Sequence, residues 1–372
     1  MIKIKSLLKS KQFARATYLP YAKKVIGLEL LFLVTCFLSL VTIVSAATPG
    51  TSGAQFLNVP VFARTAAIGD AYTGYADDAG VLDFNPAGLG NIYINEVWLS
   101  YLSYFDDTNL QSFYAAFPYR DFVIGVAGKY HSTQDTERDI SGAEKGNFSD
   151  TDMMIMPAFA YRITPDLAVG ASIKGISQQL KDEKSGDVAS DIGVYYRFLL
   201  QRVSVGASIL NIGRDVRFDS ESDPLPLALR VGGSWDVVAR MTLILDIVQP
   251  NDGSMRQCLG CEYRVSEPLA LRAGWKVDNR KFSDYTGFTC GFGLRYEQYC
   301  LDYAFVPHSD LGISHYITMG MKFGTPLPLP KSKTLAPETE GEEGGENVQP
   351  NEGETPAPAE HAPEDSGDDS GN

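Results

Sequence analysis

The chain has 372 residues, of which 44% are hydrophobic and 11% aromatic, and its formal net charge is −14. Tyr outnumbers Trp by 19 to 3 and there are 35 Gly, a mixture typical of many strands and tight turns. The slightly negative mean hydropathy excludes a bundle of membrane helices, but not a membrane barrel, which needs apolar residues only at every second strand position. The acidic balance argues against nucleic acid as a partner.

The first 47 residues have the pattern of an export signal. A basic stretch ending at Lys24 precedes the apolar run Val25–Val44, and the small residues Ser45, Ala46 and Ala47 follow. This order predicts a signal peptide at 1–47 that is removed after export. The alternative is an uncleaved membrane anchor, because the apolar run is long enough to span a bilayer.

The next region, 48–95, is rich in Gly, Ala and Asp and shows no sustained alternation of apolar and polar residues. It is too long to be a simple lead into the first strand, yet too irregular to form strands itself. Its charges, such as Arg64 and Asp70, are costly in lipid but acceptable against a charged interior. We therefore expect this region to fold inside the structure formed by the residues that follow.

Residues 96–323 are predicted to form consecutive β-strands, with turn residues between them. The predicted spans are Glu96–Phe105, Leu110–Phe117, Phe122–His131, Asp152–Tyr161, Leu167–Gln178, Ser190–Phe198, Val203–Asn211, Leu227–Trp235, Met241–Gln249, Gln257–Tyr263, Leu269–Lys276, Thr286–Tyr296, Tyr299–Pro307 and Ser314–Phe323. Long connections such as Ser132–Thr151 and Ile212–Pro226 alternate with short ones. Outer-membrane barrels have this asymmetry, with short periplasmic turns and longer external loops. The pattern predicts a fourteen-stranded antiparallel transmembrane barrel in the outer membrane.

Alternation within the strands assigns their two faces. Leu271 and Trp275, for example, alternate with Arg272 and Gly274. In a membrane barrel the apolar set faces lipid and the polar set lines the lumen. The charges predicted to face the lumen are Lys129, Lys174, Asp191, Arg197, Arg230, Asp246, Arg272, Lys276, Arg295, Asp302 and Lys322. On this assignment, an arginine at Ser204 should be better tolerated than one at Val205. The alternative is the reverse assignment, in which the apolar residues form the core of a soluble barrel.

Four cysteines follow the predicted signal peptide. Cys258 and Cys261 form a C-x-x-C, which suits a redox pair or half a zinc site, or else two small strand residues. Cys290 and Cys300 fall on neighbouring strands, but the turn at 297–298 places Cys300 opposite Arg295, so no disulfide is expected. We expect no metal and no cofactor.

The last region, 324–372, is rich in Pro, Glu and Gly, and Thr334–Asn372 carries 12 acidic residues and no Lys or Arg. It has almost nothing apolar to bury, so we expect a disordered acidic tail.

The most specific sequence pattern lies in region 48–95, where Gly53–Leu57 is followed by the run from Ala63 to Tyr72. Ala76–Ala79 and an Asn-Pro-Ala-Gly tetrapeptide at 85–88 follow. This ordered set resembles the start of the PorV/PorQ family and its uncharacterised relatives. That group in turn resembles the FadL-type fatty-acid channels, which share the Asn-Pro-Ala-Gly element. The resemblance extends to about Phe323, but the acidic tail is not part of it.

The resemblance implies a barrel whose N-terminal segment forms a plug. The plug residues that it indicates are Arg64, Asp70, Asp77, Asp78, Asn85, Pro86, Ala87 and Gly88. Arg64 and the Asp residues, with Asp83, would pair with lumen charges. Pro86 restricts Asn85 and predicts a rigid bend; Asn85 is either part of a plain turn or a ligand contact.

Three functions follow from these observations. PorV-like proteins act in protein secretion and in surface attachment of exported cargo, and this is the first hypothesis. A passive FadL-like channel for hydrophobic small molecules is the second, and a structural or adhesive surface protein is the third. The partners would be outer-membrane lipid together with exported proteins, other secretion components or hydrophobic ligands. No nucleophile and base can be matched, so an enzyme is not expected.

Overall fold

The computed structural model describes residues 51–104, 108–139, 141–181, 183–198, 202–218, 221–278, 287–308 and 312–328. The predicted signal peptide and nearly all of the predicted acidic tail lie outside these residues. Within them, no helix has the length and apolar character needed to cross a membrane.

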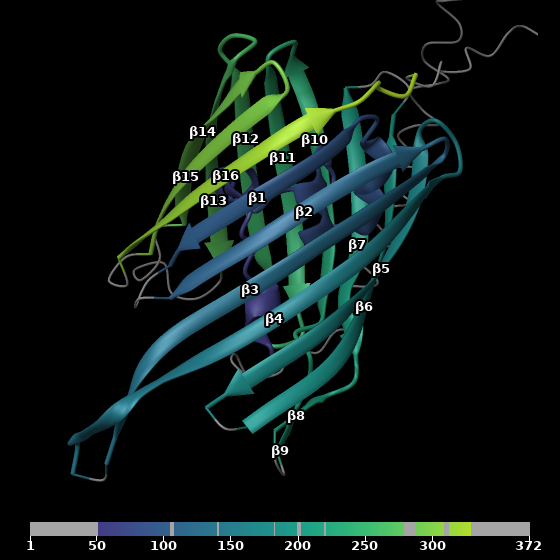
Figure 1. The fold of residues 1–372 in the computed structure, drawn as a ribbon. Coiled ribbons are helices and arrows are strands. Elements are labelled where there is room, and N and C mark those ends of the chain that lie inside the picture. The colour runs from purple at the N-terminus through teal and green to yellow at the C-terminus, as the bar shows by residue number, and fades with distance from the viewer. Residues whose placement is uncertain are drawn as a thin grey trace, which may run out of the picture. The chain divides into compact units, whose positions relative to one another are not determined.

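The chain forms a closed antiparallel barrel, which Figure 1 shows as a ribbon. The barrel strands are β1 (Asn95–Ser103), β2 (Asn109–Tyr119), β3 (Phe122–Arg138), β4 (Glu144–Arg162), β5 (Leu167–Leu180), β6 (Glu183–Arg197), β7 (Val203–Gly213), β10 (Ala228–Val238), β11 (Met241–Pro250), β12 (Arg256–Arg264), β13 (Leu269–Asp278), β14 (Phe288–Tyr296), β15 (Tyr299–Pro307) and β16 (Ile313–Phe323). Each strand pairs with its neighbour in sequence, and β1 closes the barrel against β16, with Asn95 opposite Phe323. The predicted fourteen-stranded barrel is confirmed.

Two of the predicted long loops are largely strand instead. β3 and β4 continue as a hairpin from Ser132 to Thr151, and β5 and β6 continue to a tight turn between Leu180 and Glu183. A short hairpin of β8 (Val216–Phe218) and β9 (Glu221–Asp223) occupies part of the third long connection. The sequence pattern predicts loops here, because the alternation rule requires each strand to have one apolar face. Beyond the bilayer both faces of a strand meet water, so the backbone ladder forms without that alternation.

The faces of the strands agree with the predicted assignment. Leu271 and Trp275 are 48% and 41% exposed, whereas Arg272 between them is 4% exposed. Asp246 and Asp302 are completely buried on the inward side. The soluble alternative is therefore wrong, because the charges point inward and the apolar side chains point outward. A closed barrel has no free sheet edge, so its strands pair their backbones with one another rather than with water, as a protein that spans a membrane with strands requires.

The connections define two ends of the barrel. We call the end with the turns 120–121, 163–166, 239–240, 265–268 and 297–298 the short-turn rim, and the opposite end the long-loop rim. Outward-facing aromatic residues lie beside the short turns, among them Tyr119, Trp235, Tyr263 and Tyr296. By the general rule for these barrels, the short-turn rim faces the periplasm.

Candidate functional site

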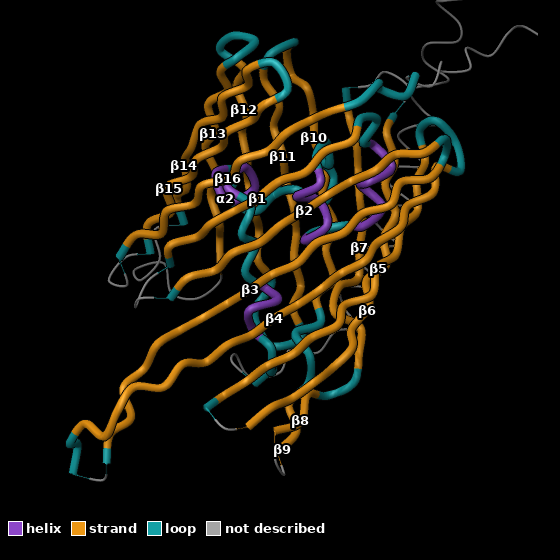
Figure 2. The backbone as a smooth tube through the Cα atoms, viewed as in Figure 1, coloured by secondary structure: helices purple, strands orange, loops and turns teal. Residues whose placement is uncertain are grey.

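Residues 51–94, the inner segment, pack against the inward-facing side chains of the barrel wall. The segment contains η1 (Gln55–Asn58), α2 (Ala63–Ala67), η2 (Ala79–Asp83) and η3 (Pro86–Asn91), which Figure 2 shows as short purple helices among the strands. α2 lies against β13–β16, whereas η3 lies against β4–β6 on the other side of the barrel. The segment therefore contacts opposite walls.

The inner segment runs from one rim to the other. Near its start, Gln55 donates a hydrogen bond to Asp252 in the β11–β12 connection, at 2.6 Å, and Ser52 contacts the same carboxylate. Near its end, the carbonyl of Gly90 accepts a hydrogen bond from Arg162 Nε at 2.6 Å, beside the short turns. Arg162 also donates to the carbonyl of Arg120, so this arginine joins the segment to the short-turn rim.

Arg64 is the centre of a cluster of charges. Its Nη1 lies 2.6 Å from Asp77 and 2.8 Å from Asp78, and its Nε lies 3.0 Å from Glu262 on β12. Tyr75 lies beside the guanidinium and donates its hydroxyl to Glu262 at 2.8 Å. Arg64, Asp78 and Glu262 are almost completely enclosed, so their charges depend on their partners rather than on water, whereas the Asp77 side chain is 32% exposed.

Further ion pairs continue this cluster along the barrel wall. Arg272 Nε lies 2.8 Å from Glu262, and its Nη1 lies 2.6 Å from Asp302. Asp302 also pairs with Arg295 at 3.0 Å. The network links α2 to β12, β13, β14 and β15, so it fixes the segment and the register of the wall together.

A second cluster holds the middle of the segment. Asp246 on β11 accepts hydrogen bonds from the backbone N–H groups of Tyr72 and Thr73, at 3.0 and 2.9 Å, and pairs with Arg230 at 3.1 Å. Asp70 in turn forms an ion pair with Lys276 on β13. Here a charged side chain of the wall accepts the hydrogen bonds of backbone N–H groups in the segment, because the segment has no regular secondary structure at this point.

The opposite wall has its own pairs. Asp83 lies 3.0 Å from Lys129 on β3, and Lys174 on β5 lies 2.9 Å from Asp191 on β6. Lys174 also donates to the side chain of Asn211, whose positive φ marks a bulge in β7. Between this wall and η1 a cavity of about 20 Å³ remains, which has room for roughly one water molecule.

The Asn-Pro-Ala-Gly element forms the bend that was predicted and packs closely on the wall. Asn85 caps η3 by accepting from the N–H of Ala87 at 3.0 Å, and its amide donates to the carbonyls of Thr73 and Val194. A Cβ at Gly193 would lie 2.0 Å from the Asn85 side chain, so the wall admits this approach only with glycine. All the polar atoms of Asn85 thus have partners within the protein, which favours a structural role over a ligand contact.

The structure brings together most of the residues selected from sequence. Arg64, Asp70, Asp77, Asp78 and Asp83 all pair with charges in the segment or on the wall. Lys322 pairs instead with Glu96 at the start of β1, at 3.0 Å. Arg197 ends β6 opposite Ser204 and joins none of the clusters above.

Two buried carboxylates of the site were missed by the sequence analysis. Glu262 is 3% exposed and Glu96 is completely buried, and both complete ion pairs. Period-two alternation from Cys258 already places Glu262 on the inward face, so this signal was available. The four described cysteines are free, and Cys300 lies opposite Arg295 as predicted. No group of three or more potential ligands among the described residues could hold a metal ion.

Comparisons with known proteins identify relatives of the fold. No protein-family model matches the chain, and no curated protein does. Among solved structures, the monoaromatic hydrocarbon channel CymD is 14% identical, with a TM-score of 0.56 over 72% of this chain and 98% of that one. The Pseudomonas putida toluene transporter TodX is 12% identical, with a TM-score of 0.52 over 74% and 98% of the two chains. A Pseudomonas aeruginosa FadL homologue is 10% identical, with a TM-score of 0.51 over 71% and 98%.

Identities this low show a shared fold and nothing finer. None of these structures bears on the PorV/PorQ part of the resemblance or on secretion. The fold and the apolar exterior agree with the predicted location in the outer membrane. The chain therefore has the fold of FadL-like outer-membrane channels.

Proposed function

We propose that this protein is a channel for small apolar molecules in the outer membrane, with the inner segment as its plug. The support comes from the barrel fold that it shares with channels for monoaromatic hydrocarbons and from a local feature of its wall. The cavity beside η1 has room for about one water, so a solute that enters it can go further only if the segment moves or if the route leaves through the wall.

The observation that carries the proposal is an interruption between β4 and β5. The ladder pairs Ile155 with Gly175 and Ala158 with Ser172, but leaves Met156 and Pro157 without partners on β5. Proline has no N–H to donate, so it weakens the ladder where it stands in the middle of a strand. The register is the same on both sides, so the interruption is a local gap and not a slip.

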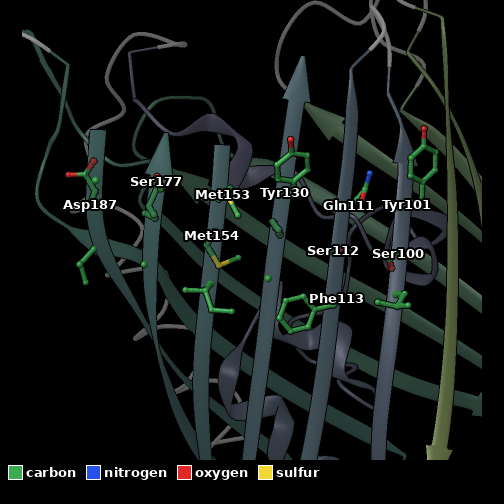
Figure 3. A pocket seen from close by; sticks show the side chains of 18 of the residues that line it. Ser100, Tyr101, Gln111, Ser112, Phe113, Tyr130, Met153, Met154, Ser177 and Asp187 are labelled. Carbon is green, nitrogen blue, oxygen red and sulfur yellow. The ribbon is translucent and has the colours of Figure 1, made fainter. Parts of the chain in front are cut away.

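Two cavities approach each other at Met154, two residues before the gap. On the outer face, an apolar groove of about 970 Å³ extends across β1–β6 and includes Phe113, Tyr130 and Met153 (Figure 3). On the inner side, the small cavity under η1 is lined by Lys174. Lys129 and Met154 line both, so only the wall at these residues separates them. If the inner segment moves and enlarges the inner cavity, a solute there would have a short path into the bilayer.

The test is a substitution that restores the missing donor. Pro157→Thr supplies an N–H and a residue that favours strands, so it should strengthen the β4–β5 ladder. Pro118→Thr, in β2 next to the short turn 120–121, is the matched control because it changes a strand proline away from the gap. We expect uptake of labelled toluene by cells to fall several-fold with Pro157→Thr and to stay unchanged with Pro118→Thr. Equal uptake by both variants and the native protein would reject the route through the wall.

A role in secretion is the second candidate, and one observation favours it. The β3–β4 hairpin between Thr133 and Ser149 pairs only with itself and projects beyond the neighbouring strands (Figure 1). Such a surface suits a protein partner better than an apolar solute. Shortening this hairpin should abolish cross-linking to exported proteins if the secretion role holds, and should leave toluene uptake unchanged.

A further inference from the structure

The cavity between η1 and the barrel wall is lined by more positive than negative charge. Its volume is about 20 Å³, and Leu57 and Pro60 of the inner segment form part of one side. The wall contributes four cationic side chains, whereas Asp83 is the one carboxylate among the described residues that line it. The four cations are Lys129, Lys174, Arg230 and Arg256.

Three of these cations have a carboxylate partner at short range. The pairs are Lys129 with Asp83 at 3.0 Å, Lys174 with Asp191 at 2.9 Å and Arg230 with Asp246 at 3.1 Å. All six side chains are almost completely enclosed by protein, so each of these cations is neutralised by one charge of the opposite sign. The charge of the fourth cation, Arg256, is not accounted for by these pairs.

Arg256 has no ion-pair partner in the part of the chain that the structure describes. It begins β12 on the inward face, two residues before the buried Cys258, and its Nε is buried without a hydrogen-bond acceptor. The carboxylate of Asp252, in the connection that leads to β12, contacts Ser52 and Gln55 instead. Because arginine stays protonated in proteins, the cavity wall carries one positive charge and one N–H donor in excess.

The size of the cavity limits what could balance this charge. A volume of about 20 Å³ admits one particle of about the size of a water molecule. Carboxylates, phosphates and other anions with several heavy atoms are too large for it. A water molecule would satisfy the donor but would leave the charge unbalanced. A halide ion is a single atom that carries one negative charge and accepts hydrogen bonds, so it meets both requirements.

We propose that this cavity binds one chloride ion, which accepts from Arg256 and balances its charge. Asn58 of η1 also lines the cavity, and its amide can donate to the same ion. Because the inner segment forms one side of the cavity, bound chloride helps to hold η1 against the wall. The site belongs to the packed arrangement of the inner segment and does not depend on which solute the barrel passes.

Bromide tests the position of the ion directly, because it replaces chloride and scatters X-rays anomalously. Crystals of the full-length protein grown in sodium bromide should show an anomalous peak in the cavity, within hydrogen-bond distance of Arg256. Crystals of Arg256→Gln should lack this peak. Peaks at the exposed surface of the native protein, with none in the cavity, would indicate an adventitious ion only and would reject the site.

A measurement in solution separates binding at this site from general effects of salt. The midpoint temperature of unfolding of the full-length protein in detergent is compared in sodium chloride and in sodium gluconate at equal ionic strength, because gluconate is too large for the cavity. Chloride should raise the midpoint of the native protein by a few degrees and then reach a plateau. Arg256→Gln should not respond to the exchange of anions. In gluconate it should be at least as stable as the native protein, because it removes an unbalanced charge.

The matched control is Arg217→Gln, which removes an exposed arginine from β8 and should respond to chloride as the native protein does. Two results in solution would overturn the proposal. Equal responses of Arg256→Gln and the native protein would mean that chloride acts elsewhere or only screens charge. The same native midpoint in chloride and in gluconate would mean that the cavity holds water, and a bromide peak would then represent binding at crystal concentration only.

Discussion

Removing Glu262 should destabilise the folded protein more than removing any surface carboxylate. Its two oxygens accept from Arg64 Nε at 3.0 Å, Arg64 Nη2 at 3.1 Å, Arg272 Nε at 2.8 Å and Tyr75 at 2.8 Å. Hydrogen bonds to charged groups contribute about 1.5–3 kcal/mol each, so a simple sum gives roughly 6–12 kcal/mol. That sum is too high, because Arg64 keeps Asp77 and Asp78 while Arg272 keeps Asp302.

The better measure is the cost of breaking a buried ion pair from one side, which is about 3–5 kcal/mol. We expect Glu262→Ala to lower the free energy of unfolding by that amount, measured by urea titration of the protein in lipid vesicles. Glu262→Gln keeps an acceptor oxygen without the charge, so its loss should be smaller. Glu267→Ala, in the exposed turn 265–268, is the control and should cost less than about 0.5 kcal/mol. If Glu262→Ala and Glu267→Ala differ by less than 1 kcal/mol, on the order of the scatter between surface changes, the buried network does not hold the segment in place.

Two further predictions concern the exterior and the mobility of the inner segment. Leu245→Arg, at an outward position in the middle of β11, should make the free energy of folding into vesicles less favourable by about 2–4 kcal/mol. Val238→Arg, at the end of β10, should make it less favourable by only about 0–1 kcal/mol. Equal losses would mean that β11 does not face lipid. Gly53→Cys with Asp223→Cys should form a disulfide that ties the start of the segment to the β8–β9 hairpin, because the Cβ atoms would lie 3.4 Å apart, close to the usual disulfide range. Oxidation of this pair should stop toluene uptake and a reductant should restore it, whereas uptake that is insensitive to oxidation would show that this end of the segment need not move.

The barrel is well predicted from the sequence because the alternation of side chains in a strand depends only on residues that are adjacent in the chain. Period-two alternation finds each strand that crosses the membrane and assigns its faces, as Arg272 between Leu271 and Ala273 illustrates. The same rule fails for the β3–β4 hairpin, where both faces meet water and no alternation is needed.

The charged site is predictable only in part, since alternation gives the face of a residue but not its partner. The rule places Arg64 and Arg272 inside, yet nothing local indicates that Glu262 lies between them. Ser204 shows the same limit. It faces inward as predicted, but its hydroxyl donates to the carbonyl of Gly74, so the wall there is already covered and an arginine has no room. The prediction that arginine is better tolerated at Ser204 than at Val205 assumed an open lumen, and this contact argues against that assumption.

The course of the inner segment from one rim to the other also constrains how the molecule is assembled. Residues near 52 lie at the long-loop rim and residues near 92 at the short-turn rim, so the segment runs lengthwise through a cylinder. A finished cylinder admits such a segment only by threading of its free end past the charges of the wall. Wrapping the strands around the segment avoids threading, and it ends when β16, the last strand made, meets β1. On this route the inward charges are neutralised before the seam closes, and the seam between β1 and β16 becomes the final step that commits the molecule to its folded state.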